Sequence, residues 1–209
     1  GANARRVIIK SRFVMLRRVG ATAVSAHLRY IEREGVTREG RKGQAYGADT
    51  DAVDLKGFGE RGRGDRHQFR FIVSPEDAVD LDDLKGFTRQ LMQRMETDLE
   101  TPLDWVAVDH WDTDNPHTHI VLRGWVGSER KGRDLVIAPD YMAHGMRQRA
   151  SEIATEWLGP RTEAEMRRSL QREVDQQRLT SLDRQLLRQA TVNIVDPVSY
   201  THLRAHETS

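Results

Sequence analysis

The stretch Trp105–Val126, WVAVDHWDTDNPHTHIVLRGWV, predicts two antiparallel strands joined by a tight turn. Its two arms, residues 105–111 and 118–126, are rich in Val, Ile, Leu and Trp, which favour strands. Between them stands TDNP (113–116), a run of turn-forming residues that folds the second arm back against the first. The stretch therefore predicts a hairpin within a mostly antiparallel sheet.

Three of the chain's eight histidines lie in this hairpin, and strand geometry brings them together. Residues two apart on a strand point to the same face, so His117 and His119 project together. The turn then places His110 beside them on the neighbouring strand. Three imidazoles on rigid strands suit a divalent cation with open coordination positions. Asp112 shares the strand parity of His110, so we expect it to orient a ligand imidazole or to touch the metal.

Strands and helices follow one another along the chain in an order typical of an α+β fold. The apolar patterns predict further strands at residues 5–16, 68–74 and 134–138, and helices at residues 22–34, 80–99, 140–158 and 161–190. This order predicts helices packed on a mostly antiparallel sheet of about five strands. We expect one domain over residues 1–160, a charged helical extension over 161–190, and a tail without structure over 191–209.

Residues 35–66 hold eight glycines and many Arg, Lys and Asp, with little apolar periodicity. This composition predicts a long flexible loop, in which residues 54–58 can form a short strand. The cations of this region could follow the backbone of a nucleic acid electrostatically. The residues concerned are Arg61, Arg63, Arg66, Arg41 and Lys42, with Arg38 beside them.

Charge is distributed unevenly along the chain. Residues 1–75 hold 16 Lys and Arg against 8 Asp and Glu, whereas residues 76–116 hold 3 against 12. A basic segment beside an acidic one is expected where one surface faces a polyanion and another face or a metal site is acidic. Ordinary solvated helix surfaces would produce the same blocks, so charge alone leaves both interpretations open.

The composition excludes several classes of protein. No run approaches the roughly 18 consecutive apolar residues that a membrane span needs, so we expect no membrane insertion. No basic-then-apolar secretion signal stands at the amino terminus, although the chain starts at Gly1 rather than at a methionine. The absence of cysteine rules out disulfides and thiolate metal sites and fits a reducing compartment.

HWDTDNPHTHIVLRG (110–124) resembles the histidine-triad motif of relaxases, the mobilisation nucleases of conjugative plasmids and of T-DNA border processing in the HUH endonuclease superfamily. The shared features are the spacing H-x-D-x4-H-x-H, the proline before the second histidine and the apolar strand after the third. HLRYIEREG (27–35) resembles the first relaxase motif, with a tyrosine near the end of a helix. HQFRFIVSPEDA (67–78) resembles the second, a strand ending in a serine. The resemblance covers about residues 5–190, and the charged helix with GPRTEAE (159–165) resembles the subfamily related to the T-DNA border enzyme.

This resemblance implies an HUH-type sheet and a metal-assisted, tyrosine-dependent strand transfer on DNA. Tyr30 would attack the scissile phosphate and stay joined to the 5′ phosphate, releasing a 3′ hydroxyl. Asp112 would support the metal on the three histidines, and Ser74 could hydrogen-bond a phosphate near the nick. The family implies Mg²⁺ or Mn²⁺, whereas imidazole ligands by themselves would favour Zn, Cu, Fe or Ni.

The resemblance also implies partners and a location. The partners are single-stranded DNA at a plasmid transfer origin, accessory proteins of a relaxosome and the coupling protein of a type IV secretion system. The location is the bacterial cytoplasm, with transfer of the DNA-bound form to a recipient cell. Two alternatives remain open: a rolling-circle replication initiator using Tyr141, and a non-catalytic nucleic-acid-binding module with structural histidines. Tyr46 is a further competitor of Tyr30.

The last residues depart from the pattern of the rest of the chain. PVSYTHLRAHETS (197–209) resembles a translated sequencing-adapter tail. We therefore assign no metal site to His202 and His206 and no catalytic role to Tyr200. The natural protein is expected to continue after residue 190 into a region that engages the secretion machinery.

Overall fold

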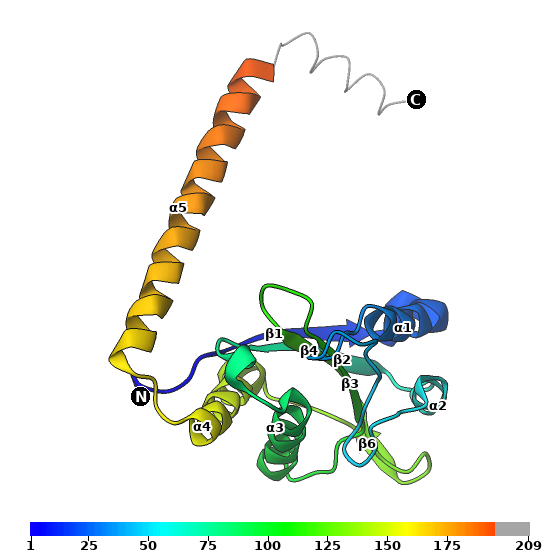
Figure 1. Ribbon diagram of the computed structural model, residues 1–209. Coiled ribbons are helices and arrows are strands. Elements are labelled where there is room, and N and C mark those ends of the chain that lie inside the picture. Colours follow the sequence, from blue (N-terminus) through cyan, green and yellow to red (C-terminus); the bar gives the residue numbers. More distant parts are fainter. Residues whose placement is uncertain (195–209) are drawn as a thin grey trace. The chain divides into compact units, whose positions relative to one another are not determined.

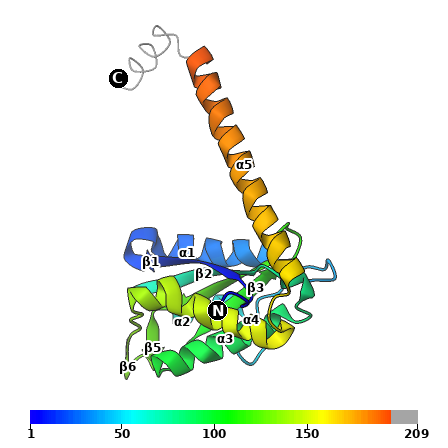
Figure 2. The same ribbon diagram turned by 90° about the vertical axis from the view of Figure 1, so that its left-hand side faces the viewer.

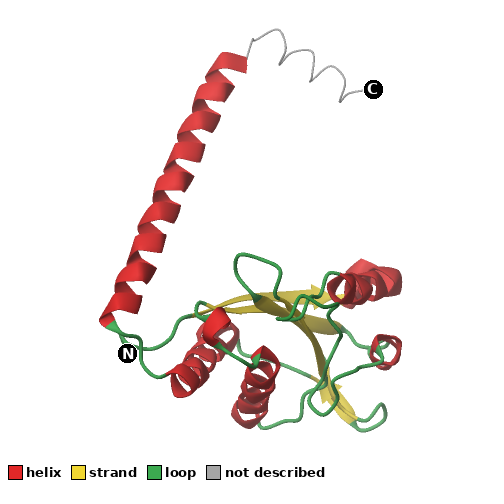
Figure 3. Cartoon of the chain, viewed as in Figure 1, coloured by secondary structure: helices red, strands yellow, loops and turns green. Residues whose placement is uncertain are grey.

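Four antiparallel strands form the central sheet of residues 1–160 in the computed structural model (Figures 1 and 3). They are β1 (Val7–Met15), β2 (His67–Pro75), β3 (Trp105–His110) and β4 (His117–Arg123), in the spatial order β1-β2-β4-β3. A separate ribbon pairs β5 (Trp125–Gly127) with β6 (Gly132–Asp134). The predicted α+β class is confirmed, with four strands in the main sheet and two outside it rather than about five in one sheet.

The structure describes residues 1–194, with side chains up to residue 190. Its helices are α1 (Leu16–Arg33), α2 (Leu55–Arg61), α3 (Leu84–Leu99), α4 (Met146–Leu158) and α5 (Glu163–Ile194), with a 3₁₀ turn at Ala78–Asp80 and a π-helical turn at Tyr141–Gly145. The chain divides into two compact units after Pro160, and the second unit contains α5. The predicted tail falls mostly outside the described residues, from 195 onward. None of the described helices has the length and apolar content to cross a membrane.

Each face of the main sheet has its own apolar core, because alternate strand residues point to opposite faces. On one face, Ile120 of β4 belongs to a cluster that includes Phe87 of α3 and several residues of α4. On the other face, Val121 belongs to a second cluster with Leu28 and Ile31 of α1 and a phenylalanine of α2. Figure 2 shows the resulting layers, with α1 above the strands and α3 and α4 below them. The fold therefore places α1 directly on the face that carries Val121.

Three predicted elements differ from the observed ones. Residues 54–58 begin helix α2 instead of forming a strand, because the Asp54 side chain accepts a hydrogen bond from the backbone N–H of Lys56 and caps the helix. The first helix starts at Leu16 instead of Thr22, with a non-helical break at Gly20 (φ 79°). The last predicted strand, at 134–138, is also wrong, since β6 ends at residue 134.

The glycine-rich segment that follows α1 is attached to the sheet. Val36 forms a backbone bridge with His110, and Tyr46 forms one with Ala107 of β3. Tyr46 is 1% exposed, so its side chain belongs to the core. A side chain at Gly43 would collide with the backbone of Gly35, which explains why glycine suits this position. The predicted flexible loop is therefore ordered over much of its length.

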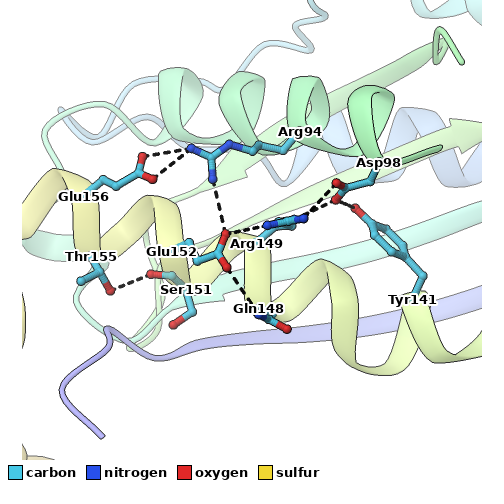
Figure 4. A network of polar contacts seen from close by, with 9 residues as sticks. All are labelled: Arg94, Asp98, Tyr141, Gln148, Arg149, Ser151, Glu152, Thr155 and Glu156. Atoms are coloured by element: carbon cyan, nitrogen blue, oxygen red, sulfur yellow. Dashed lines mark hydrogen bonds and ion pairs between the residues drawn. The ribbon is translucent and has the colours of Figure 1, made fainter. Parts of the chain in front are cut away.

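A network of polar contacts joins α3 to α4 and to the π-helical turn (Figure 4). Asp98 of α3 accepts hydrogen bonds from the Arg149 guanidinium (2.9 Å) and from the Tyr141 hydroxyl (2.8 Å). Arg94, one turn earlier, pairs with Glu152 and Glu156 of α4. Exposed ion pairs each contribute only about 0–1 kcal/mol. The network therefore mainly fixes how the two helices and Tyr141 are oriented, while the apolar contacts between the helices provide most of the stability.

Candidate metal centre

The three histidines of the hairpin converge on one face of the sheet. His110 ends β3 and lies directly opposite His117 at the start of β4, while His119 lies opposite Val108. The ring centroids are 5.2 Å apart for His110 and His117, 4.4 Å for His110 and His119, and 5.0 Å for His117 and His119. One ring nitrogen from each residue lies within 4.8 Å of those of the other two. Among the described residues, this triad is the group that could hold a metal ion, as strand parity predicts.

Two backbone carbonyls orient the rings. His110 Nε2 lies 3.0 Å from the carbonyl oxygen of Ile31, and His117 Nδ1 lies 2.8 Å from that of Asn115. A carbonyl oxygen only accepts hydrogen bonds, so these nitrogens carry the protons. In the neutral rings the lone pairs are then left on Nδ1 of His110 and on Nε2 of His117. Backbone carbonyls are frequent partners of metal-binding imidazoles, because they fix the tautomer and the ring plane.

The spacing of the facing nitrogens fits a small cation. His117 Nε2 and His119 Nε2 are 3.2 Å apart. Two nitrogens bound to one ion at about 2.1 Å, with an angle of about 90–110° between them, are about 3.0–3.4 Å apart. The chemistry of the donors and their separation therefore both fit a metal site. A hydrogen bond between the two rings would give the same distance without a metal.

Burial favours the neutral form of two of the three imidazoles, those of His110 and His119. Burial lowers the pKa of His119 to about 3, with smaller contributions from the neighbouring His110, His117 and His27. Burial also lowers the pKa of His110, against the opposing effect of its hydrogen bond to Ile31. Neutral imidazole is the ligand form of histidine, so these directions favour metal binding at neutral pH.

Asp112, predicted to support the metal, lies outside the group of ligand atoms. It follows β3 in an exposed bend and makes no hydrogen bond to a triad ring among the described residues. Its negative charge does act on His110, whose pKa it raises slightly against the effect of burial. The groups that orient the rings are instead the carbonyls of Ile31 and Asn115, which sequence reasoning missed because a carbonyl belongs to every residue type.

Tyr30, the predicted nucleophile, lies on α1, the helix that packs on the sheet face of the triad. The next residue, Ile31, is the one whose carbonyl accepts the hydrogen bond from His110. Tyr30 is 51% exposed and lies in a surface hollow with His27 and Arg33. The Arg33 guanidinium is 5.5 Å from the centroid of its ring. Within the described part of the chain, the Tyr30 hydroxyl has no hydrogen-bond partner.

The competing tyrosines have hydroxyls that are already engaged. The Tyr46 hydroxyl donates to Asp109 at 2.6 Å, and burial together with that carboxylate raises its pKa well above the ordinary value. The Tyr141 hydroxyl donates to Asp98, and burial and this carboxylate likewise raise its pKa. A phenol in such a position is a poor nucleophile, because ionisation would place a second negative charge beside the carboxylate. Tyr200 lies outside the described residues.

Ser74, the predicted phosphate contact, lies near the end of β2. The register pairs Ile72 with His119, so Ser74 lies two residues further along on the same sheet face. Its hydroxyl donates a 3.1 Å hydrogen bond to the carbonyl oxygen of Pro116, in the turn before His117. The structure thus brings Ser74 close to the triad. To donate to a phosphate, the Ser74 hydroxyl would have to break its hydrogen bond to the Pro116 carbonyl.

The five cations predicted to contact DNA lie in two segments, one at and just after α2 and one after α1. Arg61 pairs with Asp104 at 3.0 Å and lies over the Phe58 ring. Arg63 and Arg66 line a cavity of about 770 Å³ between α1 and α2. Arg41 and Lys42 are exposed in the segment that follows α1. Lys42 forms a backbone bridge with Val36, and Val36 forms another with His110 at the end of β3.

Sequence reasoning also missed a pair of arginines on the sheet face that carries the triad. Arg12 of β1 lies directly opposite Arg70 of β2. Burial and the charges of Arg70 and Arg12 lower the pKa of His27, on the overlying helix α1, to about 4. The alternation of β1 marks Lys10 and Arg12 as residues of one face, but the partner across the strand pair depends on a register that the sequence does not reveal.

Comparison with known proteins adds no relative to this picture. No protein-family model matches the chain, and no curated protein shows significant sequence similarity to it. The resemblance to relaxases therefore rests on the motifs and on the arrangement of the residues that carry them.

Proposed function

We propose that this protein is a relaxase-type endonuclease that nicks and rejoins single-stranded DNA through Tyr30, with a divalent metal on the histidine triad. The observation that carries the proposal is the hydrogen bond between His110 and the carbonyl of Ile31. This bond attaches α1 to the triad at the residue that follows Tyr30. An accessible hydroxyl nucleophile and a three-imidazole site therefore lie on adjoining elements.

The proposed reaction exchanges one phosphoester for another. The Tyr30 oxygen attacks phosphorus and loses its proton to solvent, while the bond from phosphorus to the 3′ oxygen breaks. The 3′ oxygen leaves as a hydroxyl, and the 5′ phosphate stays on Tyr30 as an ester. Attack by a 3′ hydroxyl on this ester reverses the step, so the strand can be rejoined. Arg33 supports the reaction because its positive charge, close to the Tyr30 ring, attracts the phosphate.

His110, His117 and His119 would hold the ion, which supplies positive charge that polarises a non-bridging phosphate oxygen when bound. We propose Mg²⁺ or Mn²⁺ from the resemblance, since three imidazoles suit Zn, Cu, Fe or Ni at least as well. Asp112 would add negative charge near His110, and Ser74 would donate a hydrogen bond to the phosphate.

The resemblance extends the proposal to the biological setting. The substrate would be single-stranded DNA at a plasmid transfer origin, and the process conjugative mobilisation from the bacterial cytoplasm. Relaxosome accessory proteins and a type IV coupling protein would be the partners, and the DNA-bound form would move to the recipient cell.

One observation weighs against the rolling-circle alternative. That reaction would need Tyr141 as the nucleophile, and the Tyr141 hydroxyl donates to Asp98 within the network between α3 and α4. To react, Tyr141 would have to leave this carboxylate and the adjoining Arg149 ion pair. Tyr30 has no comparable hydrogen bond to give up among the described residues.

Labelled DNA tests the proposed function directly. The full chain is incubated with Mn²⁺ and a pool of single-stranded oligonucleotides of randomised sequence, labelled at either the 3′ or the 5′ end. On a denaturing gel, the 3′ label should move with the protein and the 5′ label should not, because the 5′ phosphate stays on the enzyme.

Two matched variants identify the residue. Tyr30→Phe should abolish the adduct, and Tyr141→Phe should retain it. An adduct that survives in Tyr30→Phe would assign the nucleophile elsewhere. Binding of the pool without any adduct, unchanged by a chelator, would favour the non-catalytic binding module.

A further inference from the structure

Arg12 and Arg70 occupy a position that costs the fold stability unless an anion joins them. They are directly opposite on neighbouring antiparallel strands, where side chains begin about 4.5–5.5 Å apart and like charges are destabilising. Burial and the charge of Arg12 lower the pKa of the Arg70 guanidinium. Arg70 donates to Gln68 at 2.8 Å, and no carboxylate pairs with either guanidinium among the described residues.

The arginine pair lies next to the triad on the same face of the sheet. His119 of β4 is opposite Ile72 of β2, and Arg70 is two residues from Ile72 along the strand. Such diagonal neighbours have backbones about 7–8 Å apart. Lys10 of β1 is opposite Ile72 and shares the face. Three cations therefore lie on β1 and β2, on the sheet face that carries the triad.

Within residues 1–160, this face is open along β1, whereas Arg70 of β2 is half-buried near His27 of α1. Helix α1 covers the β3 and β4 half through Leu28 and Ile31, and α3 and α4 lie on the opposite face of the sheet (Figure 2). On β1, Lys10 and Arg12 are exposed, and Ile8, on the same face, is 60% exposed. A phosphate could therefore approach Lys10 and Arg12 from the exposed side of β1, with Arg70 on the neighbouring strand.

We propose that Arg12, Arg70 and Lys10 form a phosphate-binding site that positions single-stranded DNA beside the histidine triad, an inference that rests on the proposed function. Guanidinium groups bind phosphate oxygens in a bidentate manner, and an anion between two opposed arginines relieves their repulsion. The bound phosphate would lie about two nucleotides from the scissile phosphate, given the diagonal spacing of about 7–8 Å and a rise of about 3.4 Å per stacked nucleotide. The site thus fixes which phosphate reaches Tyr30.

Equilibrium binding without metal tests this site separately from cleavage. Fluorescence anisotropy of a labelled single-stranded oligonucleotide is measured in a chelator for wild type, Arg12→Gln, Arg70→Gln and Arg130→Gln. The last variant removes the same charge from the exposed turn between β5 and β6. We expect Arg12→Gln and Arg70→Gln each to weaken binding by about tenfold or more, and Arg130→Gln by less than about twofold. The slope of log K against log salt is negative. Its magnitude should decrease by about 0.7 for each phosphate that the variant no longer neutralises.

The outcomes separate the site from the proposed function. Equal binding by the Arg12, Arg70 and Arg130 variants would overturn the site even if the protein nicks DNA. Weak binding by the pair variants would support the site even if no nicking occurs. Duplex DNA of the same length could also bind as tightly as the single strand and lose that binding in the same variants. This result would overturn the assignment of the site to single-stranded DNA.

Folding of the variants is monitored by thermal unfolding. Because the two charges repel, Arg70→Gln should not lower the melting temperature. If it does, the exposed Arg12→Gln variant decides the outcome alone.

Discussion

Replacing His117 by alanine should remove about half or more of the thermal stabilisation that a divalent metal gives the protein. His117 contributes an Nε2 that lies 3.2 Å from that of His119, the separation of two ligands on one ion. An ion at about 100 times its dissociation constant stabilises the native state by about 2.7 kcal/mol. For a unit of this size, each kcal/mol changes the melting temperature by about 2–4 °C, so wild type should gain about 5–11 °C. Loss of one of three ligands weakens binding by at least about tenfold, equivalent to about 1.4 kcal/mol, which removes about 3–6 °C of that gain.

The assay is differential scanning fluorimetry with a chelator and with increasing Mn²⁺. His144→Ala is the matched control, because His144 is exposed on the π-helical turn and belongs to no group of candidate metal ligands among the described residues. We expect the control to show the full shift at every Mn²⁺ concentration. If His117→Ala shifts as much as wild type, the triad does not bind the ion, and the account of the metal centre fails.

Three further predictions concern the fold around the site. Tyr46→Phe should destabilise the protein by about 1–3 kcal/mol in urea unfolding, because the partly buried Asp109 loses the hydrogen bond from the Tyr46 hydroxyl. A change below about 0.5 kcal/mol would show that this bond contributes little. Gly124→Ala should unfold or strongly destabilise the protein, because its Cβ would collide with the backbone of His67, and a native circular dichroism spectrum and melting temperature would contradict this. The pKa of His27 is about 4 and that of His119 about 3, so below pH 6.5 the unfolded chain binds more protons and the metal-free protein loses stability as the pH falls. His27→Gln should show a smaller loss of melting temperature than wild type between pH 7 and pH 5, and an equal loss would refute the assignment to His27.

Local patterns predicted the hairpin and the long helices because their signals lie within a few residues. Alternation on either side of TDNP determined both the strands and the face that the three histidines share. The spacing of apolar residues likewise predicted α3. Helix α2 was missed because its seven residues carry many glycines and charges, and its start depends on the Asp54 cap.

The surroundings of the triad depend on contacts between residues far apart in the sequence. Arg12 meets Arg70 only through the register of β1 and β2, and no local pattern contains that register. The ring of His110 is oriented by a carbonyl of α1, 79 residues earlier in the chain. Asp112 was expected in this orienting role because strand parity was extended past His110, where β3 ends. Arg61, one of the cations predicted to contact DNA, pairs with Asp104, which lies 43 residues later in the chain.

Mass spectrometry of the covalent adduct identifies the residue that attacks the DNA. The full chain is incubated with Mn²⁺ and single-stranded DNA, digested with protease and nuclease, and searched for a peptide that carries a nucleotide. The account predicts a 5′-phosphate ester on the peptide that contains Tyr30, and no modification of the peptides that contain Tyr46 or Tyr141. A nucleotide on either of those tyrosines, or none on any residue while the DNA is cut, would contradict it.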